Sequence, residues 1–302
     1  MENTVQVNNV TKTFTETVAV DQLSFQVKPG EIFAMLGPNG AGKTTTIRMI
    51  LDILRPDSGT IQVLGGSPDR IAMDRVGYLP EERGLYRDLP VKECLAYLGE
   101  LKGLSRGVAL SRSIDWLERV GLEDAMDKKV SALSRGMQQK AQFIATVLHD
   151  PDLLIVDEPF AGLDPVNTML IKDMIYDLKD NGRTVIMSTH MMHQIEEMAD
   201  RLLMVNEGRL VLYGKVSDIQ SQFASHSVYV SGDGDWMSLE GVEEVAFDRD
   251  EKAYKLLLSE DYSADTFLRD ATRHSDFRID RFQVALPALD EIFVQVAGGN
   301  HQ

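Results

Sequence analysis

Hydrophobic residues in the first two thirds of the chain fall into short continuous runs that alternate with segments of helical spacing. The runs 31–36, 153–156 and 184–187 are almost entirely apolar, which is typical of parallel strands buried on both faces of a sheet. In 44–54, apolar residues recur every three or four positions. This spacing predicts a helix that ends at Arg55, next to a proline. Strands that alternate with helices predict an α/β domain with a parallel sheet.

Three other stretches complete the expected architecture. Residues 1–30 alternate apolar and polar side chains, which predicts antiparallel strands around a turn. Residues 91–148 have helical spacing and predict a helical subdomain, about 90–150, inserted into the α/β unit. The last part of the chain has a compact α+β pattern. We therefore expect two domains, 1–220 and 221–302.

Composition narrows the possible functions. The formal net charge of −16 argues against a general nucleic-acid binder, because phosphate backbones reward clustered Lys and Arg. The chain has no run of about eighteen apolar residues, and its N-terminus lacks a charged segment followed by an apolar one, so we expect a soluble chain. A single cysteine, Cys94, excludes an internal disulfide and suits a reducing cytoplasm.

The segment after the first apolar run matches the pattern G-x-x-x-x-G-K-S/T without a gap. It lies between an expected strand and an expected helix, which is the context that a phosphate-binding P-loop requires. Glycines let the backbone N–H groups approach phosphate oxygens, together with the positive end of the helix. We expect Lys43 to reach the β- and γ-phosphates and Thr44 to offer its hydroxyl to Mg²⁺. The loop consists of Gly37, Pro38, Asn39, Gly40, Ala41, Gly42, Lys43 and Thr44.

Two acidic residues end the second apolar run. Asp157 and Glu158 follow it directly, and ligands of parallel sheets bind at the carboxyl edge of the strands. We expect Asp157 to hold Mg²⁺, directly or through water. Glu158 is expected to orient or deprotonate a water that attacks the γ-phosphate. His190 ends the third run, at the same expected edge.

Together with Leu133-Ser134-Arg135-Gly136-Met137-Gln138, these motifs resemble the nucleotide-binding subunit of an ABC transporter, over roughly residues 1–220. The resemblance implies a P-loop NTPase fold, ATP and Mg²⁺ as cofactors, and ATP hydrolysis. It also implies a Walker A loop that extends to Thr45, Glu158 as catalytic base and His190 as switch histidine. Asp164 matches the D-loop, and Phe14 falls where the family has an aromatic that stacks on adenine.

Two motifs depart from the family pattern. The signature is commonly Leu-Ser-Gly-Gly-Gln, whereas this chain has Leu133-Ser134-Arg135-Gly136-Met137. The resemblance implies that the retained Ser134 and Gly136 meet a γ-phosphate, and that the arginine and methionine alter the rate or the choice of partner. Glu81 stands where the family has its Q-loop glutamine. A carboxylate there can still ligate Mg²⁺ or a water.

The segments 77–86 and 287–293 resemble the ABC-2 exporter subgroup, which includes ATPases of sodium-efflux and drug-efflux systems. The resemblance implies two ATPase subunits arranged head to tail, each signature closing over the other's P-loop nucleotide. The second subunit would be another copy of this chain or a related chain. Hydrolysis would drive a separate ABC-2-type membrane permease, which would hold the chain on the cytoplasmic face of the cell membrane.

Two other functions also use a P-loop. A soluble ABC-type ATPase acting on ribosomes or DNA usually has two cassettes or a long coiled-coil insertion, and neither fits this length, while the acidic charge also weighs against it. A small GTPase needs a guanine-specifying Asn-Lys-x-Asp, which the sequence lacks. We therefore favour the ATPase subunit of an exporter.

Overall fold

The chain divides into two compact units, with the boundary between Lys215 and Val216. We expected this boundary at residue 220, which lies inside α8 (Val216–Gln222) of the second unit. The two units are described separately. The structure, a computed structural model, describes residues 2–81, 84–224, 226–249, 251–259, 261–273 and 276–298.

The first unit is built on a six-stranded sheet whose central strands are the apolar runs of the sequence. The strand order is β5-β6-β7-β3-β8-β9, and all neighbouring pairs are parallel except β8 with β9. Every residue of β3, β6 and β7 is buried, as predicted for strands covered on both faces. The strands are β3 (Ile32–Leu36), β5 (Val76–Leu79), β6 (Leu153–Asp157), β7 (Thr184–Thr189), β8 (Arg201–Asn206) and β9 (Arg209–Lys215), and the helices that follow β3, β6 and β7 are α1 (Lys43–Ile50), α6 (Pro165–Asp180) and α7 (Met192–Met198).

Three of the parallel strands end at the same edge of this sheet. β3 pairs with β7 so that Leu36 lies opposite Thr189, and β7 pairs with β6 so that Ser188 lies opposite Asp157. The P-loop, the two acidic residues and His190 come directly after these strand ends. The register therefore brings the expected functional groups together.

A three-stranded antiparallel sheet, in the order β2-β1-β4, packs against the same core. Its apolar side chains lie among residues of the parallel sheet, and Phe25 of β2 stacks on Phe33 of β3 with ring centroids 5.6 Å apart. The strand pair predicted for residues 1–30 is thus confirmed. The strands are β1 (Val5–Phe14), β2 (Thr17–Val27) and β4 (Ser58–Val63).

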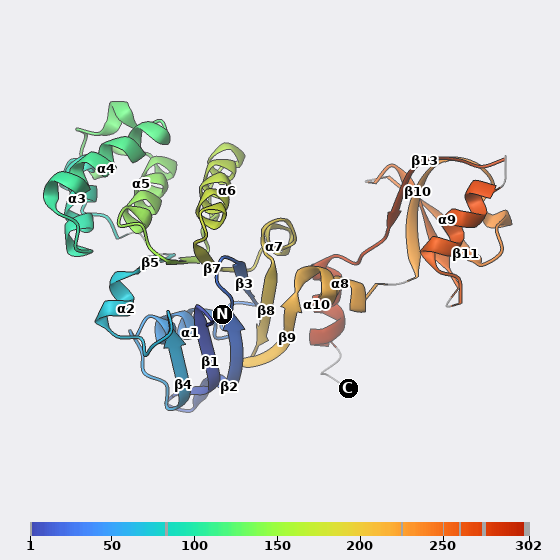
Figure 1. Ribbon diagram of the computed structural model, residues 1–302, viewed down its shortest axis with the longest axis horizontal. Helices are drawn as coiled ribbons and strands as arrows, with labels where there is room; N and C mark the ends of the chain where they lie inside the picture. The colour runs from blue at the N-terminus through green and yellow to red at the C-terminus, as the bar shows by residue number, and fades with distance from the viewer. Residues whose placement is uncertain are drawn as a thin grey trace. The chain divides into compact units, whose positions relative to one another are not determined.

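The predicted helical subdomain is also confirmed. Figure 1 shows α3, α4 and α5 grouped together, apart from the strands β1, β2 and β4 of the same unit. Helix α5 begins after Ser134, whose hydroxyl accepts a hydrogen bond from the N–H of Met137 and caps the helix. The helices are α2 (Arg70–Asp74), α3 (Val91–Leu101), α4 (Arg106–Arg119) and α5 (Arg135–Val147), with short 3₁₀ turns at Glu123–Ala125 and Val130–Ala132.

Helix α1 ends at Ile50, which corrects the expected end at Arg55. Asp52 takes a left-handed conformation, with φ of 55°. The N–H of Asp52 then donates to Met49 O and that of Ile53 to Arg48 O. This pair of bonds is a Schellman motif, which satisfies the last carbonyls and turns the chain away before the proline is reached.

The second unit is a four-stranded antiparallel sheet in the order β11-β12-β10-β13, with helix α9 on its apolar side. Its core contains Val228, Val230 and Leu256 from the strands, Phe267 from α9 and Trp236. This agrees with the expected α+β pattern. The elements are α8, β10 (Ser227–Asp233), a 3₁₀ turn (Trp236–Ser238), β11 (Val242–Asp248), β12 (Ala253–Leu258), α9 (Ala264–Arg273), β13 (Arg278–Val284) and α10 (Leu289–Gly298).

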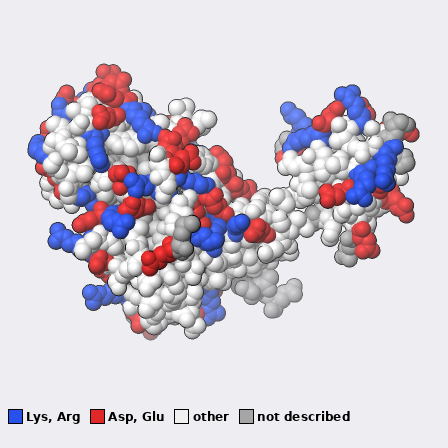
Figure 2. Space-filling view, in the orientation of Figure 1, with Lys and Arg blue, Asp and Glu red and all other residues white. Residues whose placement is uncertain are grey.

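Charged residues of both signs share the surface. On the face drawn in Figure 2, Lys and Arg are interspersed with Asp and Glu. Among the described residues, no helix combines the length and the apolar character needed to cross a membrane.

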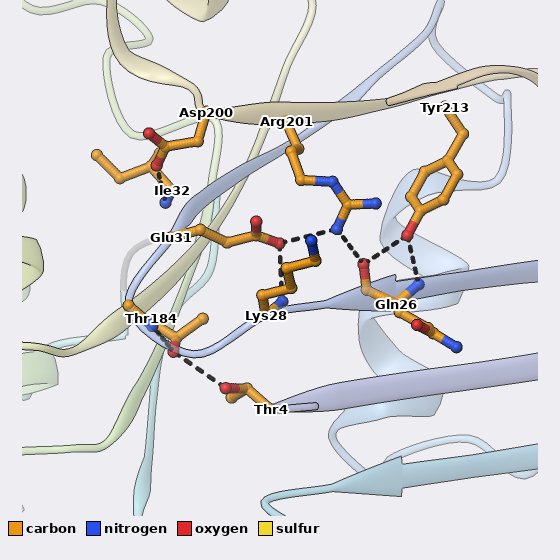
Figure 3. Close-up of polar contacts among 10 residues, drawn as sticks. Thr4, Gln26, Lys28, Glu31, Ile32, Thr184, Asp200, Arg201 and Tyr213 are labelled. Carbon is orange, nitrogen blue, oxygen red and sulfur yellow. Dashed lines mark hydrogen bonds and ion pairs between the residues drawn. The ribbon is translucent and has the colours of Figure 1, made fainter. Parts of the chain in front are cut away.

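Glu31, just before β3, joins the antiparallel sheet to the core (Figure 3). Its Oε1 accepts hydrogen bonds from Lys28 N at 2.8 Å and from Arg201 Nη1 at 3.3 Å. Arg201 also donates to Gln26 O at 3.1 Å and lies over the ring of Tyr213, 4.6 Å from its centroid. Tyr213 Oη donates to the same carbonyl at 2.8 Å. One buried ion pair therefore ties β2 to β3, β8 and β9.

Burial raises the pKa of Glu31 above its ordinary value of 4.5, and the N–H of Lys28 and the charge of Arg201 only partly oppose this. As pH falls, a carboxyl whose pKa is higher in the folded chain is protonated in the folded state before it is protonated in the unfolded state. Its contribution to stability is fully present below the unfolded pKa and is lost as pH rises through the folded pKa. Arg201 limits this loss by pairing with the charged form.

Arg201→Met should therefore destabilise the first unit most at alkaline pH. At pH 8 it leaves a buried carboxylate unpaired, which costs about 3–5 kcal/mol. At pH 5 the cost should be smaller, because Glu31 can take up a proton. Denaturant unfolding of the native and variant chains at both pH values measures this difference.

Arg209→Met is the matched control, because Arg209 pairs with Asp21 while its side chain is 75% exposed. Exposed pairs of this kind contribute about 0–1 kcal/mol. Equal costs for the two substitutions, or a cost at Arg201 that does not change with pH, would contradict the assignment.

Candidate nucleotide-binding site

The P-loop is pressed between two strands at places where only glycine fits. A Cβ on Gly37 would lie 2.2 Å from Val205 O of β8, and one on Gly42 would lie 2.4 Å from Ala19 O of β2. Gly42 also has a φ of 104°, which side chains rarely adopt. The backbone of the loop can therefore lie close to its neighbours and point its N–H groups at a ligand.

Lys43, the first residue of α1, is buried under this loop. Its Nζ donates to Gly37 O at 2.7 Å and to Pro38 O at 3.1 Å. Burial lowers the pKa of Lys43, and the carboxylates of Glu158, Asp157 and Glu81 oppose that shift. The loop carbonyls and the acids thus stabilise a positive charge at the N-terminus of α1.

Asp157, at the end of β6, is 3% exposed and is held by two hydroxyl groups. Thr44 Oγ1 donates to its Oδ2 at 3.2 Å, and Ser188 Oγ of β7 donates to its Oδ1. Neighbouring ligands of an octahedral magnesium ion lie about 3.0 Å apart, since each Mg–O distance is about 2.1 Å. The oxygens of Thr44 and Asp157 therefore fit two positions on such an ion.

Glu81 lines the same pocket and is a further oxygen donor of the chain, and phosphate oxygens and waters would fill the other positions of this ion. Among the described residues, no group of three or more His, Cys, Asp and Glu side chains could hold a metal. Magnesium usually keeps several waters and is held by one or two carboxylates plus substrate phosphates. The pair formed by Thr44 and Asp157 suits that kind of site.

Glu158 is fixed by groups from the neighbouring strand. Its N–H donates to Ser188 O at 3.0 Å, and its φ of 50° is left-handed, a strained conformation for a residue with a side chain. Thr189 Oγ1 donates to its Oε2 at 3.3 Å, and His190 Nδ1 lies 2.9 Å from its Oε1. The carboxylate is only 10% exposed. It is held rigidly next to an exposed histidine.

These groups line one pocket of about 200 Å³. Sites that enclose a whole small-molecule ligand usually measure roughly 300–1,000 Å³, so this pocket has room for the phosphate end of a nucleotide, with the base outside. Its walls are Asn39, Gly40, Gly42, Lys43, Thr44, Thr45, Glu81, Asp157, Glu158, Ala161 and His190.

Comparison with known proteins decides the family. The family described as ABC transporter matches residues 20–161, and a second, described as ATP-binding protein DrrA1-3-like, C-terminal domain, matches residues 214–297. The ABC transporter ATP-binding protein YhaQ of Bacillus subtilis, called uncharacterized, is 39% identical over 298 residues, which cover 98% of this chain and 99% of that protein. The chain belongs to the ATP-binding proteins of ABC transporters.

Two further relatives agree with this assignment. A solved structure described as the ATP binding subunit of an ABC transporter matches with a TM-score of 0.68 at 31% identity, covering 72% of this chain and 92% of that one. A Nod factor export ATP-binding protein I of Paraburkholderia xenovorans is 40% identical over 219 residues, 72% of each chain. ABC ATP-binding subunits are ATPases that dimerise and work with a membrane permease, and this chain is such a subunit.

Seven of the residues expected in the ABC site do not line the pocket: Gly37, Pro38 and Ala41 belong to the P-loop itself, and Phe14, Ser134, Gly136 and Asp164 lie elsewhere. Phe14, at the end of β1, is 44% exposed, and its ring lies 5.6 Å from the ammonium of Lys12. Ser134 and Gly136 lie at the start of α5. Asp164 caps α6 by accepting a hydrogen bond from Asn167 N at 3.0 Å, and that bond lowers the pKa of Asp164.

The starts of α5 and α6 lie next to each other, and Ser134, Gly136 and Asp164 at these starts do not line the P-loop pocket. A Cβ on Gly136 would lie 3.0 Å from Nδ2 of Asn167, which in turn donates to Asp164. Ser134 is exposed beside them. The signature and the D-loop thus form a second surface, distinct from the pocket formed by the P-loop of the same chain.

Two hydroxyl groups of β7 belong to the site although the sequence did not predict them. Ser188 and Thr189 hold Asp157 and Glu158, respectively. Two hydroxyl residues at the end of an otherwise apolar run were the available signal. These hydroxyl groups could be assigned to the site only once the strand pairing showed that β7 lies beside β6.

Gly42→Ala should weaken nucleotide binding at least about a hundredfold, because its Cβ would meet Ala19 O at 2.4 Å and force the loop to move. Titration with a fluorescent ATP analogue measures the affinity. Gly30→Ala is the control: Gly30 has a φ of 73°, but no atom lies within 4 Å of its added Cβ. Equal affinities of the two variants would show that the close approach is not needed.

Proposed function

We propose that this chain hydrolyses Mg²⁺-ATP to power export through a separate ABC-2-type permease, at the cytoplasmic face of the membrane. The observation that supports ATP hydrolysis is that two pairs of residues line the same pocket. Thr44 with Asp157 provides oxygens for a metal ion, and Glu158 with His190 provides a base and its partner.

Lys43 and the loop backbone would bind the β- and γ-phosphates. The ammonium is already inside the loop, bonded to its carbonyls. An incoming phosphate offers stronger, charged acceptors for the same protons. The loop residues Gly37 to Thr45 would surround these phosphates with N–H groups at the positive end of α1.

Thr44 and Asp157 would hold Mg²⁺, with Glu81 as a further oxygen ligand or the ligand of a bound water. Their spacing of 3.2 Å and the buried state of Asp157 support this role. The bound ion would neutralise charge on the β- and γ-phosphates. Ser188 would keep Asp157 oriented by its hydroxyl.

Glu158 would accept a proton from the attacking water. Its position supports this role, since the backbone and Thr189 fix it while it lines the phosphate pocket. His190 would hold the water or the γ-phosphate from the exposed side, and its contact with Oε1 would keep the Glu158 carboxylate oriented.

A second subunit would complete the site. Ser134, Gly136 and Asp164 lie outside the P-loop pocket of their own chain, on exposed helix starts. Placed against a second copy or a related chain, head to tail, they would face the γ-phosphate bound there. Phe14, exposed at the end of β1, would stack on the adenine that the small pocket leaves outside.

Export is supported by relatives. The similar Nod factor export ATP-binding protein I is named for that direction. The second unit matches a domain described from DrrA1-3-like ATP-binding proteins, which extends the likeness beyond the ATPase unit.

Glu158→Gln should lower turnover at least about a hundredfold, because the amide keeps the shape but cannot take a proton. ATP affinity should remain near native. Steady-state ATPase assays and binding of a fluorescent ATP analogue measure the two effects. Glu118→Gln, on the exposed side of α4, is the control and should leave both unchanged. Native turnover in the Glu158 variant would exclude it as the base.

A further inference from the structure

One face of α5 lies over the catalytic end of the sheet. Arg135, Gln139 and Gln142 occupy positions i, i+4 and i+7 of this region, so they lie on the same side of the helix. All three line a second cleft, whose other walls include Glu81 and Glu158. This cleft shares Glu81, Asp157, Glu158 and Ala161 with the phosphate pocket.

The two glutamines attach α5 to the backbone beside the acidic residues. Gln139 Nε2 donates to the carbonyl of Pro159, next to Glu158, at 3.0 Å. Gln142 Nε2 donates to the carbonyl of Pro80, next to Glu81, at 3.4 Å. The first turn of α5 is therefore held near both carboxylates, and this attachment fixes where Arg135 lies.

Among the described residues, the guanidinium of Arg135 forms no ion pair with any single carboxylate. It lies against the backbone of Gly162, where an added Cβ would be 2.5 Å from Nη2 and 2.8 Å from Cζ. In the part of the chain that the structure describes, no carboxylate lies within the 4.0 Å limit of an ion pair with it. It still shares a cleft with Glu81, Asp157 and Glu158.

Two departures from the family pattern meet in this cleft. Glu81 adds a negative charge where the family has a neutral glutamine, and Arg135 adds a positive charge where the signature commonly has glycine. In the sequence they are far apart. In the structure they line one cleft next to the phosphate pocket, so their charges act on the same place.

We propose that Arg135 is a positioning residue that offsets the charge of Glu81 and thereby permits Mg²⁺-ATP to bind. This rests on the proposed ATP site. The phosphates bring further negative charge to a pocket that already holds three carboxylates, and repulsion between like charges weakens binding. The guanidinium lowers that repulsion without touching the phosphates in its own chain. It should therefore act on affinity much more than on the chemical step.

The test is a double-mutant cycle of Arg135→Gln and Glu81→Gln, measured as KM and kcat for Mg²⁺-ATP and as affinity for a fluorescent ATP analogue. Arg135→Gln alone should raise KM about tenfold with kcat nearly unchanged, a size typical of coupled neighbours. In the Glu81→Gln background the same change should raise KM less than about twofold. Arg135→Lys keeps the charge and should keep a near-native KM.

The salt dependence of KM is a second measurement, and it would not change if the role of Arg135 were only structural. The guanidinium is exposed, so its effect should shrink between about 0.05 M and 0.5 M salt in the native background, because ions screen exposed charges. An equal rise in KM in both backgrounds, or no rise in either, would overturn the proposal. Failure of the proposed function would look different: the native chain would neither bind nor hydrolyse ATP.

Discussion

The parallel pairing of β3, β7 and β6 is the constraint on which the rest of the site depends. Because Leu36 lies opposite Thr189 and Ser188 lies opposite Asp157, the three strands end together. Each strand end then supplies one part of the chemistry: the P-loop, the two acidic residues, and the hydroxyl groups with the histidine. A shift of one residue in β6 would turn Asp157 to the other face of the sheet. The buried apolar runs fix that register and thereby position the polar groups.

The balance of charges in the phosphate pocket depends on the same arrangement of strand ends. The pocket holds three carboxylates and one buried ammonium, although its expected ligand is itself an anion. The hydroxyl groups of Thr44 and Ser188 hold the carboxylate of Asp157, and that of Thr189 holds the carboxylate of Glu158. Among the residues that the structure describes, neither acid forms an ion pair with a lysine or an arginine. Metal binding at Thr44 and Asp157 would supply the missing positive charge only together with the nucleotide. Arg135 fits this picture as the positive charge that offsets the additional acid at position 81.

Much of the fold could be predicted from the sequence, because apolar runs, helical spacing and the glycine-rich loop are local signals. The P-loop, Asp157, Glu158 and His190 were all expected at one sheet edge, and the structure places them there. The predicted end of α1 was wrong because the chain turns at Asp52, before it reaches the proline. The roles of Ser188 and Thr189 and the cleft around Arg135 could not be predicted, since both depend on which strands and helices become neighbours. The roles expected for Phe14, Ser134, Gly136 and Asp164 were predicted from the sequence and stay predictions, because they require a ligand or a second subunit.

The most direct test of the central claim, that the pocket is half of a site completed by a second subunit, is the mass of the Glu158→Gln chain measured by light scattering during size exclusion with Mg²⁺-ATP. Lys43 contributes the buried charge that an ATP phosphate needs. We expect a dimer with ATP and a monomer without it, and a monomer in both conditions once Lys43→Ala is added. An ATP-dependent dimer that survives the loss of Lys43 would contradict it.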